Sequence, residues 1–274
     1  MPLEDHCGDV ISKSRRSTGV SIEAAATAAN LSVGELGELE ESGRISKVPD
    51  YRALGDLLGL DAVKLQGVGE GWEPQPLDLA RWRCLRQIAT SGADFSVNAY
   101  VAWDGETREA ALFDTGFDAR PIFELIDEFQ LRPTQLFITH SHHDHIEALS
   151  PIRQRFPEIK LHSSSQAAPV VQQNRTGETI RVGGLSVGNR PTPGHAEDGA
   201  TYVVEAFPNG APPVAVVGDA IFAGSIGGAR ELAELAKKAI REQIFSLPQD
   251  TLICPGHGPV TTVSEEMVHN PFFV

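Results

Sequence analysis

The chain has 274 residues, of which 41% are hydrophobic and 22% are charged, proportions that are typical of a soluble globular protein. The formal net charge of −14 disfavours nucleic acids and anionic membranes as partners, and no apolar run is long enough to predict a membrane span. Cys7, Cys84 and Cys254 are widely separated and no secretory signal precedes them, so we expect a cytoplasmic protein without disulfides.

A stretch rich in Gly and Pro, GVGEGWEPQP at residues 67–76, predicts a linker. Short helical patterns precede it, and strand patterns that alternate with helical ones follow it. We therefore expect a small all-α domain over residues 1–70 and an α/β domain over residues 71–274.

Within the first domain, Ser21 and Ser32 are suited to begin helices, because a serine side chain can accept hydrogen bonds from the free N–H groups of a first turn. Gly43 is suited to end the second of these helices, because glycine adopts the left-handed conformation that commonly follows a helix. The run DYRALGDLLGL at residues 50–60 predicts another helix with an apolar face.

The segments RR, SIEAAATAANLSVGELGELEESGR and YRALGDLLGLDAVKL together resemble a lambda-repressor-like helix-turn-helix module. The helix that would enter a DNA groove, residues 32–41, carries four glutamates and no Lys or Arg, and residues 1–70 hold seven basic and twelve acidic side chains. Affinity for DNA depends on neutralised phosphates. We therefore favour a packing role or a role in forming a homodimer over nucleic-acid binding.

The second domain is expected to contain many strands with interspersed helices, which suits two sheets flanked by helices. Strands are predicted at residues 96–103, 109–116, 134–140, 159–164, 178–182, 185–191, 200–207, 213–219 and 251–258. Helices are predicted at residues 121–131, 145–156 and 229–247.

Four of the nine histidines fall within ITHSHHDHIEA, directly after an apolar strand pattern. Their spacing is H-x-H-x-D-H. Because His140 and His142 are two residues apart, an extended backbone points both to the same side, where they can share one metal ion. Asp144 and His145 follow on a turn and can face a second ion beside the first.

Further candidate ligands lie downstream in similar positions. His195 follows a Pro-Gly pair, and Asp219 and His257 end strong strand patterns. Imidazole and carboxylate ligands suit zinc, manganese or iron. Two such ions can lower the pKa of a shared water from 15.7 to about 7, so that a bridging hydroxide attacks a carbonyl carbon at neutral pH.

Residues 75–274 resemble the metallo-β-lactamase superfamily, and the segments GDAIFAGSIG, PGHGPVTTV and HNPFF resemble its glyoxalase II-like, or hydroxyacylglutathione hydrolase-like, members. The resemblance implies an αββα sandwich that holds two divalent ions, for which we expect zinc. It also implies a first metal held by His140, His142 and His195, a second held by Asp144, His145 and His257, and Asp219 as the bridge. Asp144 or Asp219 would orient the attacking water.

Several neighbouring residues allow two interpretations. Ser225 and Arg230 follow the bridging aspartate and are candidates for substrate binding, Arg230 toward a carboxylate, although a surface arginine is the ordinary alternative. Asp114 either supports the site as a hydrogen-bond acceptor or lies exposed at a turn. We expect His143 either at the surface or supporting the ligands, rather than as a ligand itself. His162 and His269 are expected to be structural.

The leading hypothesis is a metallo-hydrolase that acts on small thioesters. Glyoxalase II enzymes carry a basic helical domain at the C-terminus, whereas the helical part of this chain lies at the other end, which leaves the thiol carrier open. A second hypothesis is a persulfide dioxygenase, which by resemblance would hold one iron with His140, His195 and Asp219. A third is a ligand-sensing regulator that binds DNA through the helical part.

Overall fold

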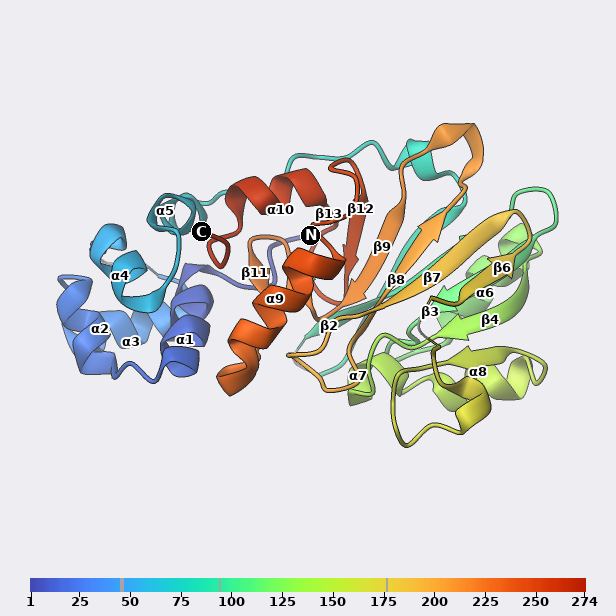
Figure 1. Ribbon diagram of the computed structural model, residues 1–274, viewed down its shortest axis with the longest axis horizontal. Coiled ribbons are helices and arrows are strands. Elements are labelled where there is room, and N and C mark those ends of the chain that lie inside the picture. The colour runs from blue at the N-terminus through green and yellow to red at the C-terminus, as the bar shows by residue number, and fades with distance from the viewer. Residues whose placement is uncertain (45–46, 94, 176) are drawn as a thin grey trace.

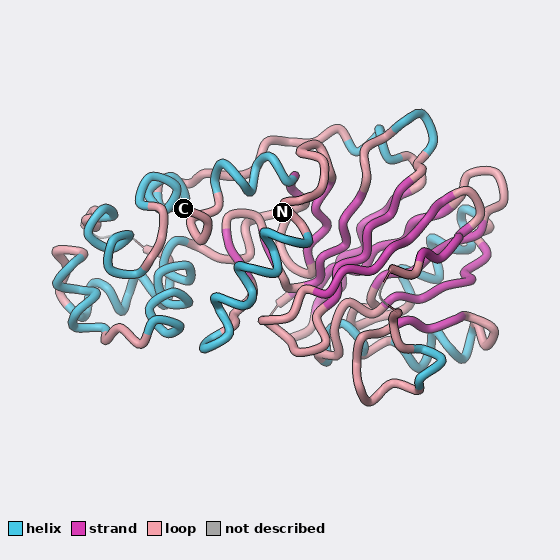
Figure 2. The backbone as a smooth tube through the Cα atoms, in the orientation of Figure 1, coloured by secondary structure: helices cyan, strands magenta, loops and turns pink. Residues whose placement is uncertain are grey.

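Two β-sheets pack face to face at the centre of the second part of the chain (Figures 1 and 2). The computed structural model describes residues 1–44, 47–93, 95–175 and 177–274. The first sheet has the order β1-β2-β3-β4-β5, in which β3, β4 and β5 are parallel and the other neighbours antiparallel. Its strands are β1 (Leu85–Ser91), β2 (Ser96–Trp103), β3 (Glu109–Phe113), β4 (Arg132–Phe137) and β5 (Lys160–His162).

The second sheet has the order β13-β12-β9-β8-β7-β6, in which only the pair β12 and β9 is parallel among the described strands. Its strands are β6 (Thr179–Val182), β7 (Leu185–Pro191), β8 (Ala200–Glu205), β9 (Val214–Gly218), β12 (Leu252–Pro255) and β13 (Thr261–Thr262). A separate short hairpin joins β10 (Ile221–Phe222) to β11 (Ser225–Ile226).

Aromatic side chains fill the space between the two sheets. Phe113 of β3 stacks on Phe137 of β4 with ring centroids 5.1 Å apart, and Phe137 lies 4.9 Å from the ring of Tyr202 on β8. The Tyr202 hydroxyl donates a hydrogen bond of 3.0 Å to the carbonyl of Ile138, just beyond β4. These contacts fix the end of β4 against the second sheet.

Helices cover the outer face of each sheet, which completes the predicted αββα layers. Ile122 and Ile126 of α6 and Ile152 of α8 pack on the first sheet, and Ile240 of α9 packs on the second. The helices of this part are α6 (Arg120–Phe129), α7 (His143–Ile146), α8 (Leu149–Arg155), α9 (Ala233–Gln243) and α10 (Val263–His269). Short 3-10 helices are η1 (Leu79–Trp82), η2 (Val170–Gln172), η3 (Pro208–Gly210) and η4 (Arg230–Leu232).

The first 69 residues form an all-helical part, as predicted from the sequence. Its helices are α1 (Cys7–Thr18), α2 (Ile22–Ala28), α3 (Val33–Ser42), α4 (Tyr51–Leu58) and α5 (Ala62–Gly69). Ser21 and Ser32 accept hydrogen bonds from the first turns of α2 and α3, and Gly43 ends α3 in the left-handed conformation at φ 68°. The identity of this part as a helix-turn-helix module stays a prediction.

The helical part is not a loosely attached appendage, because it shares a hydrophobic core with the second sheet. Ile11 of α1 and Leu65 of α5 belong to the same buried cluster as Val217 of β9, Ile226 of β11 and Phe272 near the C-terminus. In Figure 1 the C-terminus accordingly lies beside α5. The acidic helix α3 is also held internally, since the guanidinium of Arg15 donates two hydrogen bonds of 2.7 Å to the Glu40 carboxylate.

Some elements differ from the sequence-based expectation. The predicted helix over residues 145–156 is divided into α7 and α8, and the helix predicted to begin at residue 229 opens with the 3-10 turn η4. The strand β1 was not predicted, because its sequence LRQIATS is largely polar and lacks strict alternation: the buried residues are Leu85, Ile88 and Thr90. No helix among the described residues is long and apolar enough to cross a membrane.

The shared core makes a prediction about unfolding. Replacing the fully buried Ile11 with alanine should lower the free energy of unfolding by about 2–5 kcal/mol, whereas Val63→Ala, on the 81% exposed Val63 of α5, should change it little. Circular dichroism reports on all helices, whereas tryptophan fluorescence reports on the shared core at Trp72 and on the sandwich at Trp82 and Trp103. Both signals should shift together in denaturant. A separate, earlier loss of helical signal in the variant would show that the helical part unfolds independently.

Candidate metal centre

The predicted ligands meet where strands of both sheets end at one edge of the sandwich. His140 follows β4, Asp219 follows β9 and His257 follows β12, while His195 lies in the connection between β7 and β8. Asp144 and His145 lie on the short helix α7 rather than in the turn that was expected. Strands fix the backbone, and the segments that follow them turn the side chains toward one another.

Three histidines form the first group of the centre. The Nε2 atoms of His140 and His195 each lie 3.0 Å from Nδ1 of His142. His140 is 2% exposed, whereas His142 is exposed and forms the open side of the group. Three ring nitrogens thus face one point.

Asp144, His145 and His257 form the second group, and Asp219 lies between the two groups. The Asp144 Oδ2 atom is 3.2 Å from Nε2 of His257 and 3.5 Å from Nε2 of His145. Asp219 reaches His145 with Oδ1 at 3.3 Å, and it reaches both His195 and His257 with Oδ2 at 3.4 Å. A carboxylate in this position can contact ions held by either group.

The donor set fits divalent metal ions. In each of three sets, the ligand atoms lie within 4.8 Å of one another: His140, His142 and His195; His140, His145 and Asp219; and Asp144, His145 and His257. Within the described residues, the buried atoms His145 Nε2 and Asp219 Oδ1 have no hydrogen-bond partner. Leaving buried polar atoms unpaired costs stability, and a cation held by these atoms would remove that cost.

The second nitrogen of each buried ring is held by a partner outside the centre. His145 Nδ1 donates to Asp114 at 2.8 Å, His257 Nδ1 to the carbonyl of Ser96 at 2.7 Å, and His195 Nδ1 to the carbonyl of Gly228 at 3.2 Å. Such bonds fix the tautomer and leave Nε2 free to bind a metal.

Asp114 resolves one of the open alternatives in favour of a supporting role. It is 2% exposed, and besides His145 it accepts hydrogen bonds of 2.7 Å from the backbone and from the hydroxyl of Thr139. Because the Thr139 hydroxyl donates to Asp114, it accepts from Nδ1 of His140 at 3.1 Å. One carboxylate therefore orients a histidine of each group.

A pocket of about 500 Å³ opens beside the centre on the exposed side of His142 and His195. Most of the residues around it are polar or acidic, among them Ser141, Ser164, Gln166, Glu197 and Asp198. Its size lies within the range of small-molecule sites.

Comparisons with known proteins agree with this geometry. A family model of the metallo-beta-lactamase superfamily matches residues 92–173. Hydroxyacylglutathione hydrolase GloC of Haemophilus influenzae is 28% identical over 204 residues, which cover 65% of this chain and 93% of that protein. The mitochondrial persulfide dioxygenase ETHE1 of Homo sapiens is 32% identical over 184 residues, covering 63% of this chain and 69% of the relative. The chain belongs to the metallo-β-lactamase superfamily.

A solved structure of the superfamily shows the same fold. BLEG-1 B3 metallo-beta-lactamase is 30% identical with a TM-score of 0.58, and the match covers 69% of this chain and 99% of that chain. The family and structure matches confirm the predicted metallo-β-lactamase fold, and members of this superfamily bind divalent metals. The relatives include both a hydroxyacylglutathione hydrolase and a persulfide dioxygenase.

The remaining candidates of the sequence lie outside the metal cluster. His143 is exposed and lies 2.5 Å from Glu147, while His162 is hydrogen-bonded to Gln135 at 2.8 Å. The ring of His269 stacks on Trp72 with centroids 4.9 Å apart. All three positions agree with the structural or surface roles that were expected.

The two predicted substrate residues have different surroundings. Ser225 is fully buried, its hydroxyl donates to Asp5, and its carbonyl accepts a bond of 2.8 Å from Asn270. These contacts leave no face of Ser225 open to a substrate, because the hairpin folds it back against the N-terminal segment. Arg230 is exposed and lines a cavity beside α1.

The charges of the metal-free centre set opposite pKa shifts for its histidines. Burial and the neighbouring His145 lower the pKa of His140 to about 2. Burial also opposes protonation of His145 and His257, but the neighbouring carboxylates of Asp114, Asp144 and Asp219 outweigh it and raise the pKa to about 10 for His145 and about 11 for His257. Burial disfavours the ionised form of Asp219, yet the positive charges of the adjacent His145 and His257 rings hold its pKa well below its ordinary value.

These shifts predict proton release when metal binds. At pH 7 the raised pKa values keep His145 and His257 protonated in the metal-free protein, and both must lose a proton to become ligands. Binding should therefore release about two protons per molecule, and apparent metal affinity should rise as the pH increases from 6 to 9. Calorimetric titration of the metal-free protein in two buffers of different ionisation enthalpy measures this number. Identical heats in both buffers would contradict the prediction.

The supporting role of Asp114 makes a second prediction. Asp114→Asn should weaken metal affinity by about 10–100-fold, because it removes the charge that orients His145 and, through Thr139, His140. Competition with a chelator measures the affinity. The matched control is Asp118→Asn, on a carboxylate that pairs instead with the exposed Arg120. Equal affinity of both variants would assign Asp114 to folding alone.

Proposed function

We propose that the protein is a hydrolase of thioesters, similar in activity to glyoxalase II, that depends on two divalent metal ions. The observation that carries the proposal is the complete second group of Asp144, His145 and His257 beside the first, with Asp219 between them. The 28% identity to a hydroxyacylglutathione hydrolase over 93% of that relative supports the substrate class.

In the proposed reaction, water adds to the acyl carbon, the carbon–sulfur bond breaks, and the products are a carboxylic acid and a thiol. A pair of bound divalent ions would supply a water of lowered pKa and an electrophile for the carbonyl oxygen. His140, His142 and His195 would hold one ion, and Asp144, His145 and His257 the other, with Asp219 touching both.

The carboxylates of the chain would orient the reacting water. Hydrogen bonding to His257 and the charge of His145 keep the pKa of Asp144 below its ordinary value against the opposing effect of burial, so Asp144 is ionised at neutral pH. Asp219 is ionised for the same reason. An ionised carboxylate accepts a hydrogen bond from water, which fixes the direction of the oxygen lone pairs.

A second candidate activity is persulfide oxidation by a single iron ion, supported by the 32% identity to a persulfide dioxygenase. The two proposals differ in metal content and in the need for oxygen. Two ions per chain and hydrolysis without oxygen support the first, whereas one iron and oxygen uptake that depends on a persulfide would replace it with the second.

Hydrolysis of S-lactoylglutathione by the metal-loaded protein tests the main proposal. His142→Ala should reduce turnover by more than about 100-fold, because it removes a ligand that contacts both His140 and His195. The matched control is His143→Ala, one residue away with a side chain that is 77% exposed, and it should retain full activity. Equal losses in both variants would refute the ligand assignment.

A further inference from the structure

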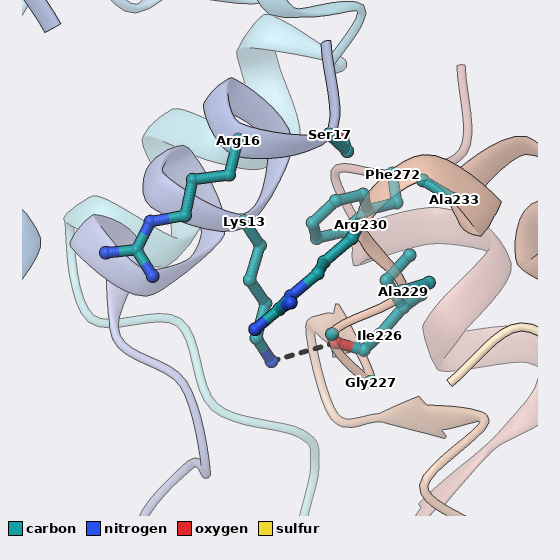
Figure 3. A pocket seen from close by; sticks show the side chains of 10 residues that line it. Lys13, Arg16, Ser17, Ile226, Gly227, Ala229, Arg230, Ala233 and Phe272 are labelled. Atoms are coloured by element: carbon teal, nitrogen blue, oxygen red, sulfur yellow. Dashed lines mark hydrogen bonds between the residues drawn. The ribbon is translucent and has the colours of Figure 1, made fainter. Parts of the chain in front are cut away.

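A second cavity lies between the helical part and the rest of the chain, which carries the candidate metal centre. It has a volume of about 320 Å³, and its walls come from α1, from the segment that joins β11 to η4, and from Phe272 (Figure 3). Neither part of the chain encloses it alone. A volume at the lower end of small-molecule sites suits one end of a ligand rather than a whole one.

The cavity shares a wall with the metal centre. Gly227 and Gly228 line it, and the carbonyl of Gly228 accepts the hydrogen bond of His195 Nδ1 at 3.2 Å. A side chain at Gly227 would collide with the backbone oxygen of Asp219, because an added Cβ would lie 1.9 Å from it. An added Cβ at Gly228, by contrast, meets no described atom within 4 Å. There is therefore free space beside Gly228, whereas the backbone at Gly227, one residue earlier, is closely packed.

Cationic side chains gather in this cavity although the chain as a whole carries a net charge of −14. Figure 3 shows Lys13 and Arg230 reaching toward the same place beside Ile226, whereas the guanidinium of Arg16 points away from them on the rim. Lys13 donates a hydrogen bond of 2.9 Å to the carbonyl of Ile226 and forms an ion pair with Asp5. Among the described residues, Arg16 and Arg230 have no acidic partner.

Acidic groups near the cavity satisfy Lys13 and not the arginines. The Asp5 carboxylate forms an ion pair with Lys13 and accepts a hydrogen bond from the Ser225 hydroxyl. An ammonium and a guanidinium that converge repel each other, and an anion between them would turn the repulsion into attraction.

The backbone of Arg230 adopts a strained conformation. Its φ of 43° lies in the left-handed region that residues other than glycine rarely adopt. The residue begins η4, which packs against α1. The strained turn directs the side chain into the cavity rather than along the outside of α9.

From these observations we propose that the cavity binds an anionic end group, a carboxylate or a phosphate, of the thiol carrier in the thioester substrate, and that α1 supplies part of this subsite. The inference rests on the proposed thioester hydrolysis for the identity of the carrier. It gives the helical part a direct role in substrate recognition through Lys13, whereas Arg16 lies on the rim.

Binding of product thiols to the full-length, metal-loaded protein tests the proposal by calorimetry. Glutathione offers carboxylates, coenzyme A offers phosphates, and N-acetylcysteamine is an uncharged thiol. Arg230→Ala should weaken binding of the preferred anionic thiol by about tenfold, and Arg230→Lys should restore most of it. Arg52→Ala, on an exposed arginine of α4 outside the cavity, is the matched control and should leave binding unchanged.

The contribution of the helical part is tested with Lys13→Ala, which should weaken binding of the same thiol, whereas Arg16→Ala, on the rim, should leave it nearly unchanged. In kinetics, Arg230→Ala should raise KM for the charged thioester about tenfold at constant kcat, and it should not alter hydrolysis of S-lactoyl-N-acetylcysteamine. Preference for glutathione or for coenzyme A identifies the end group as carboxylate or phosphate.

The proposal is overturned if neither anionic thiol binds, or if Arg230→Ala binds both as tightly as the unaltered protein. Failure of the hydrolase function has a different signature. In that case no thioester is turned over, the uncharged one included, while binding of an anionic thiol still depends on Arg230. That result would retain the anion subsite and assign the metal centre another reaction.

Discussion

The ionised carboxylate of Asp219 is the charge on which the arrangement of the metal centre depends. It is 7% exposed, and its two oxygens lie within 3.4 Å of ring nitrogens from three histidines. Burying a carboxylate is costly unless opposite charge surrounds it closely. The packing leaves it little room to move, since a Cβ at Gly256 would lie 2.2 Å from Asp219 Oδ1. The histidines must therefore reach Asp219 from fixed strand ends, and their outer hydrogen bonds hold them there.

The need to hold Asp219 in place also gives a role to the packing of the helical part against the rest of the chain. Asp219 follows β9, and the outer face of β9 is covered by the core that α1 and α5 share with the C-terminal residues. The segment before α1 continues this contact toward the centre, because Glu4 packs on Gly258, next to His257. Displacing the helical part would expose the back of the strand that precedes Asp219. Stability of the core and geometry of the metal centre are thus linked.

The gathering of the seven proposed ligands could be predicted from the sequence, because metal binding demands particular side chains at particular spacings. The supporting partners could be predicted only in part. Asp114 allowed two interpretations, and the carbonyls of Ser96 and Gly228 carry no sequence signal, since every residue has a carbonyl. Ser225 was assigned to the substrate because it follows Asp219 closely in sequence, but the β10–β11 hairpin turns it into the core. Such tertiary contacts decide orientation, which residue order does not encode.

Charge is distributed unequally on the two sides of His195. The pocket that exposes His142 and His195 is bordered by Glu197 and Asp198, whereas the cavity behind Gly228 is bordered by lysine and arginine side chains. An elongated ligand with one anionic end has lower electrostatic energy when that end lies in the cationic cavity and its uncharged end faces the acidic pocket. The scissile bond of such a ligand would then lie between the two, beside the metal centre. In the proposed thioester hydrolase, specificity for a charged carrier would follow from the way the helical part closes one side of the site.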